Sequence, residues 1–171
     1  ALSKYRLAII ENPNSAQLWN NIGLCFFSKG TKIVAAVSCL RRAAYICPFE
    51  WMINYNLGVT YLALGQYASA FHYFSASINM HPGYALSYSY LAVTLSKLDD
   101  FDNSCGAYEK ALGIQDDATT RLNYAVTLYR YDEIERAKQQ LARFETLYLS
   151  ESEKEKEGKL EPSAMRLKEL A

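Results

Sequence analysis

The stretch Leu18-Trp19-Asn20-Asn21-Ile22-Gly23-Leu24-Cys25-Phe26-Phe27 contains the pattern that decides the fold. Within it, an aromatic, an aliphatic, a small and a second aromatic residue follow one another at steps of three, one and three: Trp19, Ile22, Gly23 and Phe26. The same four positions recur three more times: Asn54, Leu57, Gly58 and Tyr61; Tyr88, Leu91, Ala92 and Leu95; Arg121, Tyr124, Ala125 and Leu128. The small residue therefore returns at intervals of 35, 34 and 33 residues, which indicates an internal repeat.

A second set of positions follows the first in each unit. It reads Ala36, Leu40, Ala43 and Pro48; then Ala70, Phe74, Ser77 and Pro82; then Ser104, Tyr108, Ala111 and Asp116. Steps of three and four residues place each set on one face of a helix, and no segment shows the strict alternation of a strand. Two helices per unit of about 34 residues, packed where a small side chain lets them approach, is the tetratricopeptide-repeat (TPR) pattern. The sequence thus predicts an all-α fold, a right-handed solenoid of antiparallel helix pairs.

The register also predicts the organisation of the chain. We expect the second helix of a truncated repeat at 1–15, repeats at 16–50, 51–84 and 85–117, an atypical repeat at 118–149, and a charged tail with a capping helix at 150–171. Because a lone second helix has no partner for its apolar face, the start at mid-repeat suggests a piece of a longer protein; a natural capping helix is the alternative. In the tail, a segment rich in Glu, Lys and Ser precedes Pro162 and a weakly amphipathic helix at 163–170.

Composition describes a helical binding domain with no sign of a nucleic-acid or membrane partner. Of the 171 residues, 50% are hydrophobic and 21% are charged, and the formal net charge is zero. Zero net charge argues against nucleic acid, whose phosphates require a clustered basic surface. No apolar run is long enough to span a membrane, so we expect no direct membrane insertion.

The residues that could carry chemistry do not form a recognisable site. The four cysteines, Cys25, Cys39, Cys47 and Cys105, match neither a zinc site nor a redox pair. The two histidines have no adjacent carboxylate cluster, and the one tight acidic group, 99–102, lies in a turn where an Asp usually caps the next helix. We therefore expect no enzyme activity, catalytic residue, metal, cofactor or small-molecule substrate.

Protein binding remains, and the repeat indicates where it would occur. In stacked pairs the first helices line a concave face, whose candidate residues here are Asn20, Asn21, Leu24, Phe27, Met52, Tyr55, Asn56, Val59, Tyr90, Lys97, Asn123, Tyr129 and Arg130. The asparagines at one repeated position, Asn21, Asn56 and Asn123, could grip an extended peptide backbone or could tie neighbouring helices together. Only Lys97 and Arg130 could bind a carboxylate terminus, and they belong to separate units. Apolar and aromatic candidates favour a helical or folded partner.

Beyond the repeat pattern, several runs resemble a known family. They are residues 18–27, 35–43 (AAVSCLRRA), 48–51 (PFEW), 55–58 (YNLG), 66–72 (QYASAFH) and 122–126 (LNYAV). These runs are similar to the fourth Bardet-Biedl syndrome family, and they include residues that the repeat does not require: Cys25, Phe27, Ser38, Cys39, Phe49 and His72. The resemblance covers about residues 1–130 and is absent from the charged tail.

The resemblance implies a role in ciliary transport. Members of that family are subunits of the BBSome, a coat-like complex that moves membrane proteins into and out of cilia, and they also occur at centriolar satellites. We therefore expect a scaffold that contacts other BBSome subunits, including another TPR subunit, in the cytoplasm, at the cilium or its base, or at centriolar satellites. Two alternatives stay open: a chaperone-type or other peptide-docking TPR adaptor, and the repeat arm of a larger enzyme.

Overall fold

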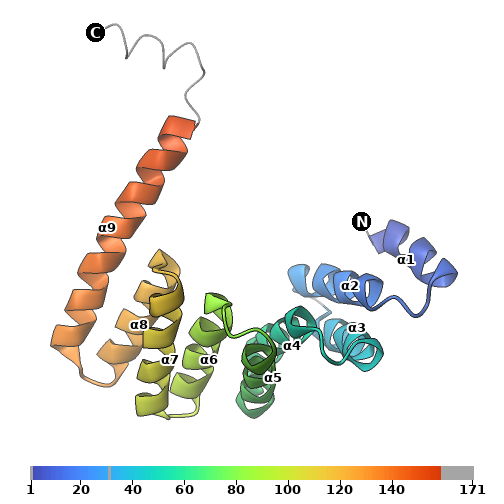
Figure 1. Cartoon of the computed structure of the whole chain (residues 1–171), viewed down its shortest axis with the longest axis horizontal. Helices are drawn as coiled ribbons and strands as arrows, with labels where there is room; N and C mark the ends of the chain where they lie inside the picture. The colour runs from blue at the N-terminus through green and yellow to red at the C-terminus, as the bar shows by residue number, and fades with distance from the viewer. Residues whose placement is uncertain (1, 31, 159–171) are drawn as a thin grey trace, which may run out of the picture. The chain divides into compact units, whose positions relative to one another are not determined.

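A computed structural model describes residues 2–30 and 32–158 of the chain (Figure 1). Across these residues every regular element is a helix: α1 (Leu2–Glu11), α2 (Ala16–Ser28), α3 (Ile33–Ile46), α4 (Trp51–Ala63), α5 (Tyr67–Met80), α6 (Ala85–Lys97), α7 (Phe101–Ile114), α8 (Ala118–Arg130) and α9 (Ile134–Gly158). The predicted all-α fold of paired helices is confirmed. The helices form two compact units, α1–α7 within residues 1–115 and α8–α9 within residues 116–171.

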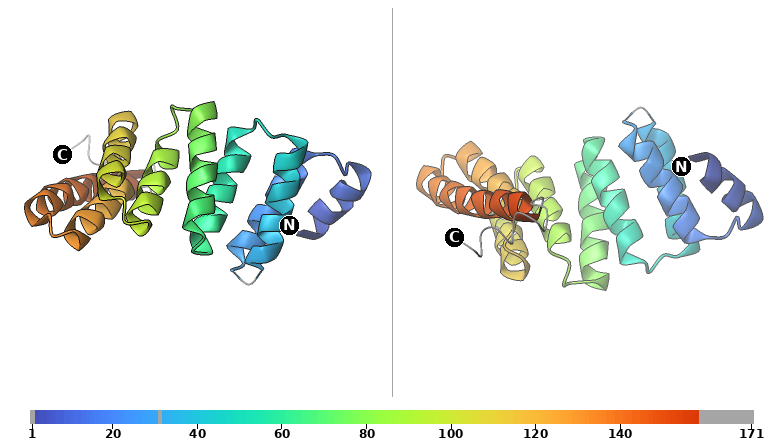
Figure 2. Two further views of the ribbon diagram at one scale, coloured as in Figure 1. Left: turned by 90° about the horizontal axis from the view of Figure 1, so that it is seen from below. Right: turned by 90° about the horizontal axis from the view of Figure 1, so that it is seen from above.

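In the first unit, helices pack as consecutive antiparallel pairs. The pairs are α2 with α3, α4 with α5, and α6 with α7; each pair also contacts the next one, through α3 and α4 and through α5 and α6. Figure 2 shows neighbouring helices of this unit side by side with alternating direction. The first helices also touch one another, α2 with α4 and α4 with α6. We call the face that α2, α4 and α6 form the first-helix face.

The glycines of the repeat explain how closely the paired helices approach. A Cβ atom on Gly58 would lie 2.7 Å from two ring carbons of Phe74, and one on Gly23 would lie 2.7 Å from Cγ of Leu40. Leu40 and Phe74 are fully buried. The repeat pattern predicts that a small side chain on the first helix lets the two helices approach, and the side chain that it meets on the second helix is a large one in both pairs. Glycine is needed because the bulky side chain of the second helix fills the space that a Cβ atom would take.

Turns and polar contacts follow the same register. The turn inside each pair contains one residue with a left-handed backbone, Gly30, Gly65, Asp99 or Asp132, at φ angles of 66°, 71°, 59° and 63°. Asp100 accepts a hydrogen bond from the backbone N–H of Asn103 at the start of α7, so the predicted capping role in this acidic group is confirmed.

The second unit contains one pair, in which α8 packs against the longer α9. α9 has 25 residues and continues to Gly158, past the point near residue 149 where the sequence pattern places the change to a charged tail. Glu and Lys are good helix formers, and neither Gly nor Pro interrupts 134–157, so nothing in the local sequence ends the helix earlier. The helix expected at 163–170 lies outside the described residues.

Candidate protein-binding surface

The candidate binding residues of the first unit lie on α2, α4 and α6, as the register predicts, but they differ in accessibility. Leu24, Met52 and Lys97 are exposed; Asn21, Phe27, Tyr55, Val59 and Tyr90 are half-buried; Asn20 and Asn56 are buried. A buried side chain cannot offer its polar atoms to an incoming chain. The set therefore divides into residues that hold the repeats together and residues that a partner can reach.

Two of the asparagines bind each other. Nδ2 of Asn56 in α4 donates a hydrogen bond to Oδ1 of Asn20 in α2, with 2.9 Å between the two atoms. Both side chains are only 8% exposed. This bond ties the first helices of neighbouring repeats, which is the second of the two roles considered for the asparagine row. Asn21 is half-buried on α2, and Asn123 is half-buried on α8 in the other unit.

An aromatic cluster fills the junction between α4 and α6, and it contains two more candidates. The ring of Tyr55 lies 5.2 Å from that of Tyr84, 5.9 Å from that of Tyr90 and 6.1 Å from that of Phe74. The ring of Trp51 packs against those of Tyr84 and His81, with 4.7 Å between centroids in each case. Offset and edge-on aromatic contacts at these distances stabilise packing beyond the area they bury. Tyr55 and Tyr90 therefore act mainly in the contact between repeats.

The environment of Tyr55 also changes its acidity. Burial is the largest cause that raises the pKa of Tyr55 above its usual value, and the neighbouring Tyr90 and Tyr84 raise it further. A phenolate formed there would lose hydration and face other phenols. The Tyr55 hydroxyl group therefore stays protonated at pH values at which an exposed tyrosine would lose its proton.

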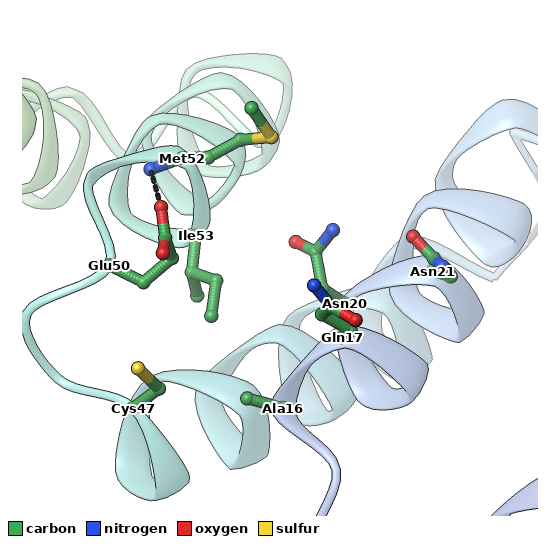
Figure 3. A pocket seen from close by; sticks show the side chains of 8 residues that line it. All are labelled: Ala16, Gln17, Asn20, Asn21, Cys47, Glu50, Met52 and Ile53. Atoms are coloured by element: carbon green, nitrogen blue, oxygen red, sulfur yellow. Dashed lines mark hydrogen bonds between the residues drawn. The ribbon is translucent and has the colours of Figure 1, made fainter.

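The equivalent junction between α2 and α4 is open. A pocket of about 630 Å³ lies there, lined by Ala16, Gln17, Asn20, Asn21, Cys47, Glu50, Met52 and Ile53. In Figure 3, Gln17 and Asn20 project from α2 toward the start of α4, where Ile53 and the N-cap residue Glu50 lie. A dashed line marks the 3.4 Å hydrogen bond from the Met52 backbone N–H to Glu50 Oε1. We call this cavity the α2–α4 pocket.

The α2–α4 pocket includes residues that the candidate list missed. Ala16, Cys47, Glu50 and Ile53 line it but were not among the predicted binding residues. The repeat register contains the signal that could have found them. Counting from the small residues of each repeat, the positions of Ala16, Asn20, Cys47 and Glu50 correspond to Trp51, Tyr55, His81 and Tyr84. The four residues with rings at the α4–α6 junction are thus replaced by small or polar residues at the α2–α4 junction.

The remaining candidates belong to the second unit. Tyr129 and Arg130 are exposed at the end of α8, and the guanidinium carbon of Arg130 lies 5.5 Å from the ring centre of Tyr131. A second, apolar pocket of about 380 Å³ lies between α8 and α9, lined by Leu122, Ala125, Val126, Tyr129, Ile134, Ala137, Lys138 and Leu141. Lys97 is in the first unit and Arg130 is in the second.

The side chains that could carry chemistry, chiefly cysteines and histidines, are packed against other residues of the fold. Cys39 and Cys105 are buried, and burial raises the pKa of the Cys39 thiol, which disfavours the reactive thiolate. His81 packs against Trp51, and His72 contacts the ring of Tyr73. Within 2–30 and 32–158, no three His, Cys, Asp or Glu side chains are grouped so that they could hold a metal ion. In the same ranges, no helix combines the length and apolar character that a membrane crossing requires.

Comparison with known proteins places the chain in its class. The tetratricopeptide-repeat family model matches residues 53–84. Solved TPR structures have the same fold: MamA from Desulfovibrio magneticus aligns with a TM-score of 0.80 at 18% identity, over 87% of this chain and 84% of that one. YrrB, a TPR protein with an unusual peptide-binding site, aligns with a TM-score of 0.71 at 19% identity, over 84% of this chain and 74% of that one. The chain is a TPR protein.

Sequence relatives specify the resemblance further. The chain is 49% identical over 147 residues to the BBSome complex member BBS4 of Xenopus tropicalis, and 50% identical over 134 residues to that of Mus musculus. These matches cover 80% and 78% of this chain but 28% and 26% of the relatives. The Caenorhabditis elegans relative is 35% identical over 150 residues, which are 88% of this chain and 32% of the relative. The similarity to the BBS4 family is confirmed, over a segment about a quarter to a third as long as its relatives.

Proposed function

We propose that this chain is the repeat region of a BBSome subunit and acts there as a non-catalytic scaffold for other proteins. The observation that carries the proposal is the identity of about one half to vertebrate BBS4 over most of the chain. Helix pairing alone would not require this identity, since MamA has the same fold at 18% identity. The shared positions therefore reflect more than the demands of the repeat.

The surface supports a scaffold role. First helices of a TPR array present side chains to a partner, and here they combine an open pocket with exposed apolar residues such as Leu24 and Met52. The partners we propose are other BBSome subunits, including a second TPR subunit, in the trafficking of ciliary membrane proteins. The proposed location is the cytoplasm, with the cilium, its base and centriolar satellites as sites of action.

The proposal is tested by capturing the full-length parent protein, with an affinity tag, from ciliated cells and identifying bound proteins by mass spectrometry. We expect several BBSome subunits to be recovered, in amounts comparable to one another. As a matched control, the tagged MamA repeat domain provides the same fold without the sequence similarity and should recover none of them. Recovery of heat-shock chaperones without any BBSome subunit would replace the proposal with a chaperone-type adaptor.

A further inference from the structure

The α2–α4 pocket is a cavity that the fold does not require. At the next junction, which the same repeat builds, the corresponding volume contains the rings of Trp51, Tyr55 and Tyr84 with ring centres 4.7 to 5.2 Å apart. Protein interiors are usually packed to high density, so a gap where a neighbouring repeat is filled marks a place where another molecule can insert a side chain.

The chemistry of the pocket restricts what that side chain can be. Glu50 is the one charged residue among the eight that line it. In addition to the Glu50 carboxylate, the side-chain amide oxygens of Gln17 and Asn21 are acceptors. Oδ1 of Asn20 already accepts a hydrogen bond from Asn56. Met52 and Ile53 supply apolar walls on the α4 side. An occupant should therefore carry positive charge with several donors at its tip and methylene groups along its stem.

We infer that the α2–α4 pocket binds an arginine side chain from a segment of a partner protein. The planar guanidinium group offers five N–H donors, which suit a carboxylate together with separate amide oxygens. Its aliphatic stem packs on Met52 and Ile53. The carboxylate of Glu50 is the charge-bearing acceptor, and a charge-assisted hydrogen bond is about twice as strong as a neutral one.

The surroundings of the pocket suit a peptide segment. Leu24 lies one helical turn after Asn20 on α2 and is 36% exposed, and Met52 is 47% exposed at the start of α4. These two side chains offer apolar contacts to the residues that flank the arginine. The inference deepens the proposed scaffold function, because it names the chemistry by which this face would recognise a partner.

The test uses the full 171-residue chain with labelled methyl groups and two blocked tripeptides as probes, Gly-Arg-Gly and Gly-citrulline-Gly. Citrulline has nearly the shape of arginine but no charge. We expect the arginine probe to shift the methyl resonances of Ala16, Met52 and Ile53, with a dissociation constant on the order of 1 mM for so small a ligand. The citrulline probe should bind at least fivefold more weakly.

Two variants separate binding from folding. Glu50→Gln keeps an acceptor for the Met52 backbone N–H but removes the charge. It should weaken the binding of the arginine probe at least fivefold. Ala16→Trp places a ring where Trp51 lies in the next repeat; it should block the pocket and abolish the shifts without lowering the melting temperature. Glu145→Gln, an exposed change on α9, is the matched control and should bind as the parent chain does.

Three results would overturn the inference: equal binding of both probes, full binding by a folded Glu50→Gln or Ala16→Trp chain, or shifts that exclude the pocket methyl groups. The capture experiment on the parent protein is read separately. If BBSome subunits are recovered while the arginine probe does not bind, the scaffold proposal stands and the inference fails. If the probe binds but no BBSome subunit is recovered, the scaffold proposal fails in its BBSome form.

Discussion

Two junctions of the first unit join equivalent helices of the repeat but differ in their interiors. Between α4 and α6, rings from Trp51, Tyr55 and Tyr84 pack against one another. Between α2 and α4, the positions equivalent to these three hold Ala16, Asn20 and Glu50, and a pocket of about 630 Å³ remains.

The difference shows how a repeat protein can assign separate tasks to equivalent positions. A filled junction contributes apolar burial and aromatic contacts to stability. An open junction gives up part of that contribution: there the buried hydrogen bond from Asn56 to Asn20 joins α2 to α4, and an apolar cluster that includes Leu40 of α3 and Ile53 of α4 supplies the packing. Because each repeat contacts mainly its neighbours, one junction can be open while adjacent ones keep the array folded.

The sharpest way to break this comparison is to truncate the equivalent residues Tyr55 and Asn20. Tyr55→Ala removes a ring that contacts three others, and we expect it to lower the free energy of unfolding by about 3 kcal/mol. Asn20→Ala leaves the amide of Asn56 without its acceptor and should cost about 1 to 2 kcal/mol. Urea unfolding followed by circular dichroism measures both. Equal losses in the two variants would contradict the distinction between a filled and an open junction.

A smaller effect is expected at the glycine beneath the filled junction. Gly58→Ala would place a Cβ atom 2.7 Å from the buried ring of Phe74, which stacks on Tyr90 with 5.9 Å between ring centres. Overpacking costs about 1 to 3 kcal/mol, and the higher helix propensity of Ala returns about 1 kcal/mol, so a net loss of up to about 2 kcal/mol should appear.

Gly106 is the matched control for that change. It lies within α7, and a Cβ atom there would meet nothing within 4 Å. Gly106→Ala should therefore raise the free energy of unfolding by about 0.5 to 1 kcal/mol, through helix propensity alone. Thermal melts of the two variants give the comparison, and a stabilised Gly58→Ala chain would show that Phe74 can move aside.

The smallest effect concerns pH. Burial raises the pKa of Tyr55 in the folded chain. The contribution of the protonated hydroxyl group to stability is therefore fully present below the usual tyrosine pKa of about 10. This contribution is lost as the pH rises above that value, because the unfolded chain releases the proton first. We expect the urea midpoint to fall as the pH rises from about 10 to 11, and Tyr55→Phe to make this fall less steep. Parallel curves for the two chains would count against a buried, protonated hydroxyl in the aromatic cluster.

Much of this architecture could be read from the sequence because the repeat constrains it locally. Steps of three and four residues locate the helix faces, and Gly23 and Gly58 identify the close approaches. The helix cap at Asp100 could be predicted for a similar reason, because capping involves residues that are only three apart in the sequence. The length of α9 was less readable, because no residue between 134 and 157 ends a helix by itself.

The sequence by itself determined the pairing of helices, the register and the likeness to the BBS4 family, since these depend on spacing along the chain and on residue identity. Only the tertiary structure decided that Asn56 binds Asn20, that Tyr55 and Tyr90 belong to the packing, and that a pocket opens beside Glu50. The physical reason is that the register fixes the direction in which a side chain points, while its burial depends on the volumes of side chains from other helices that are distant in the sequence.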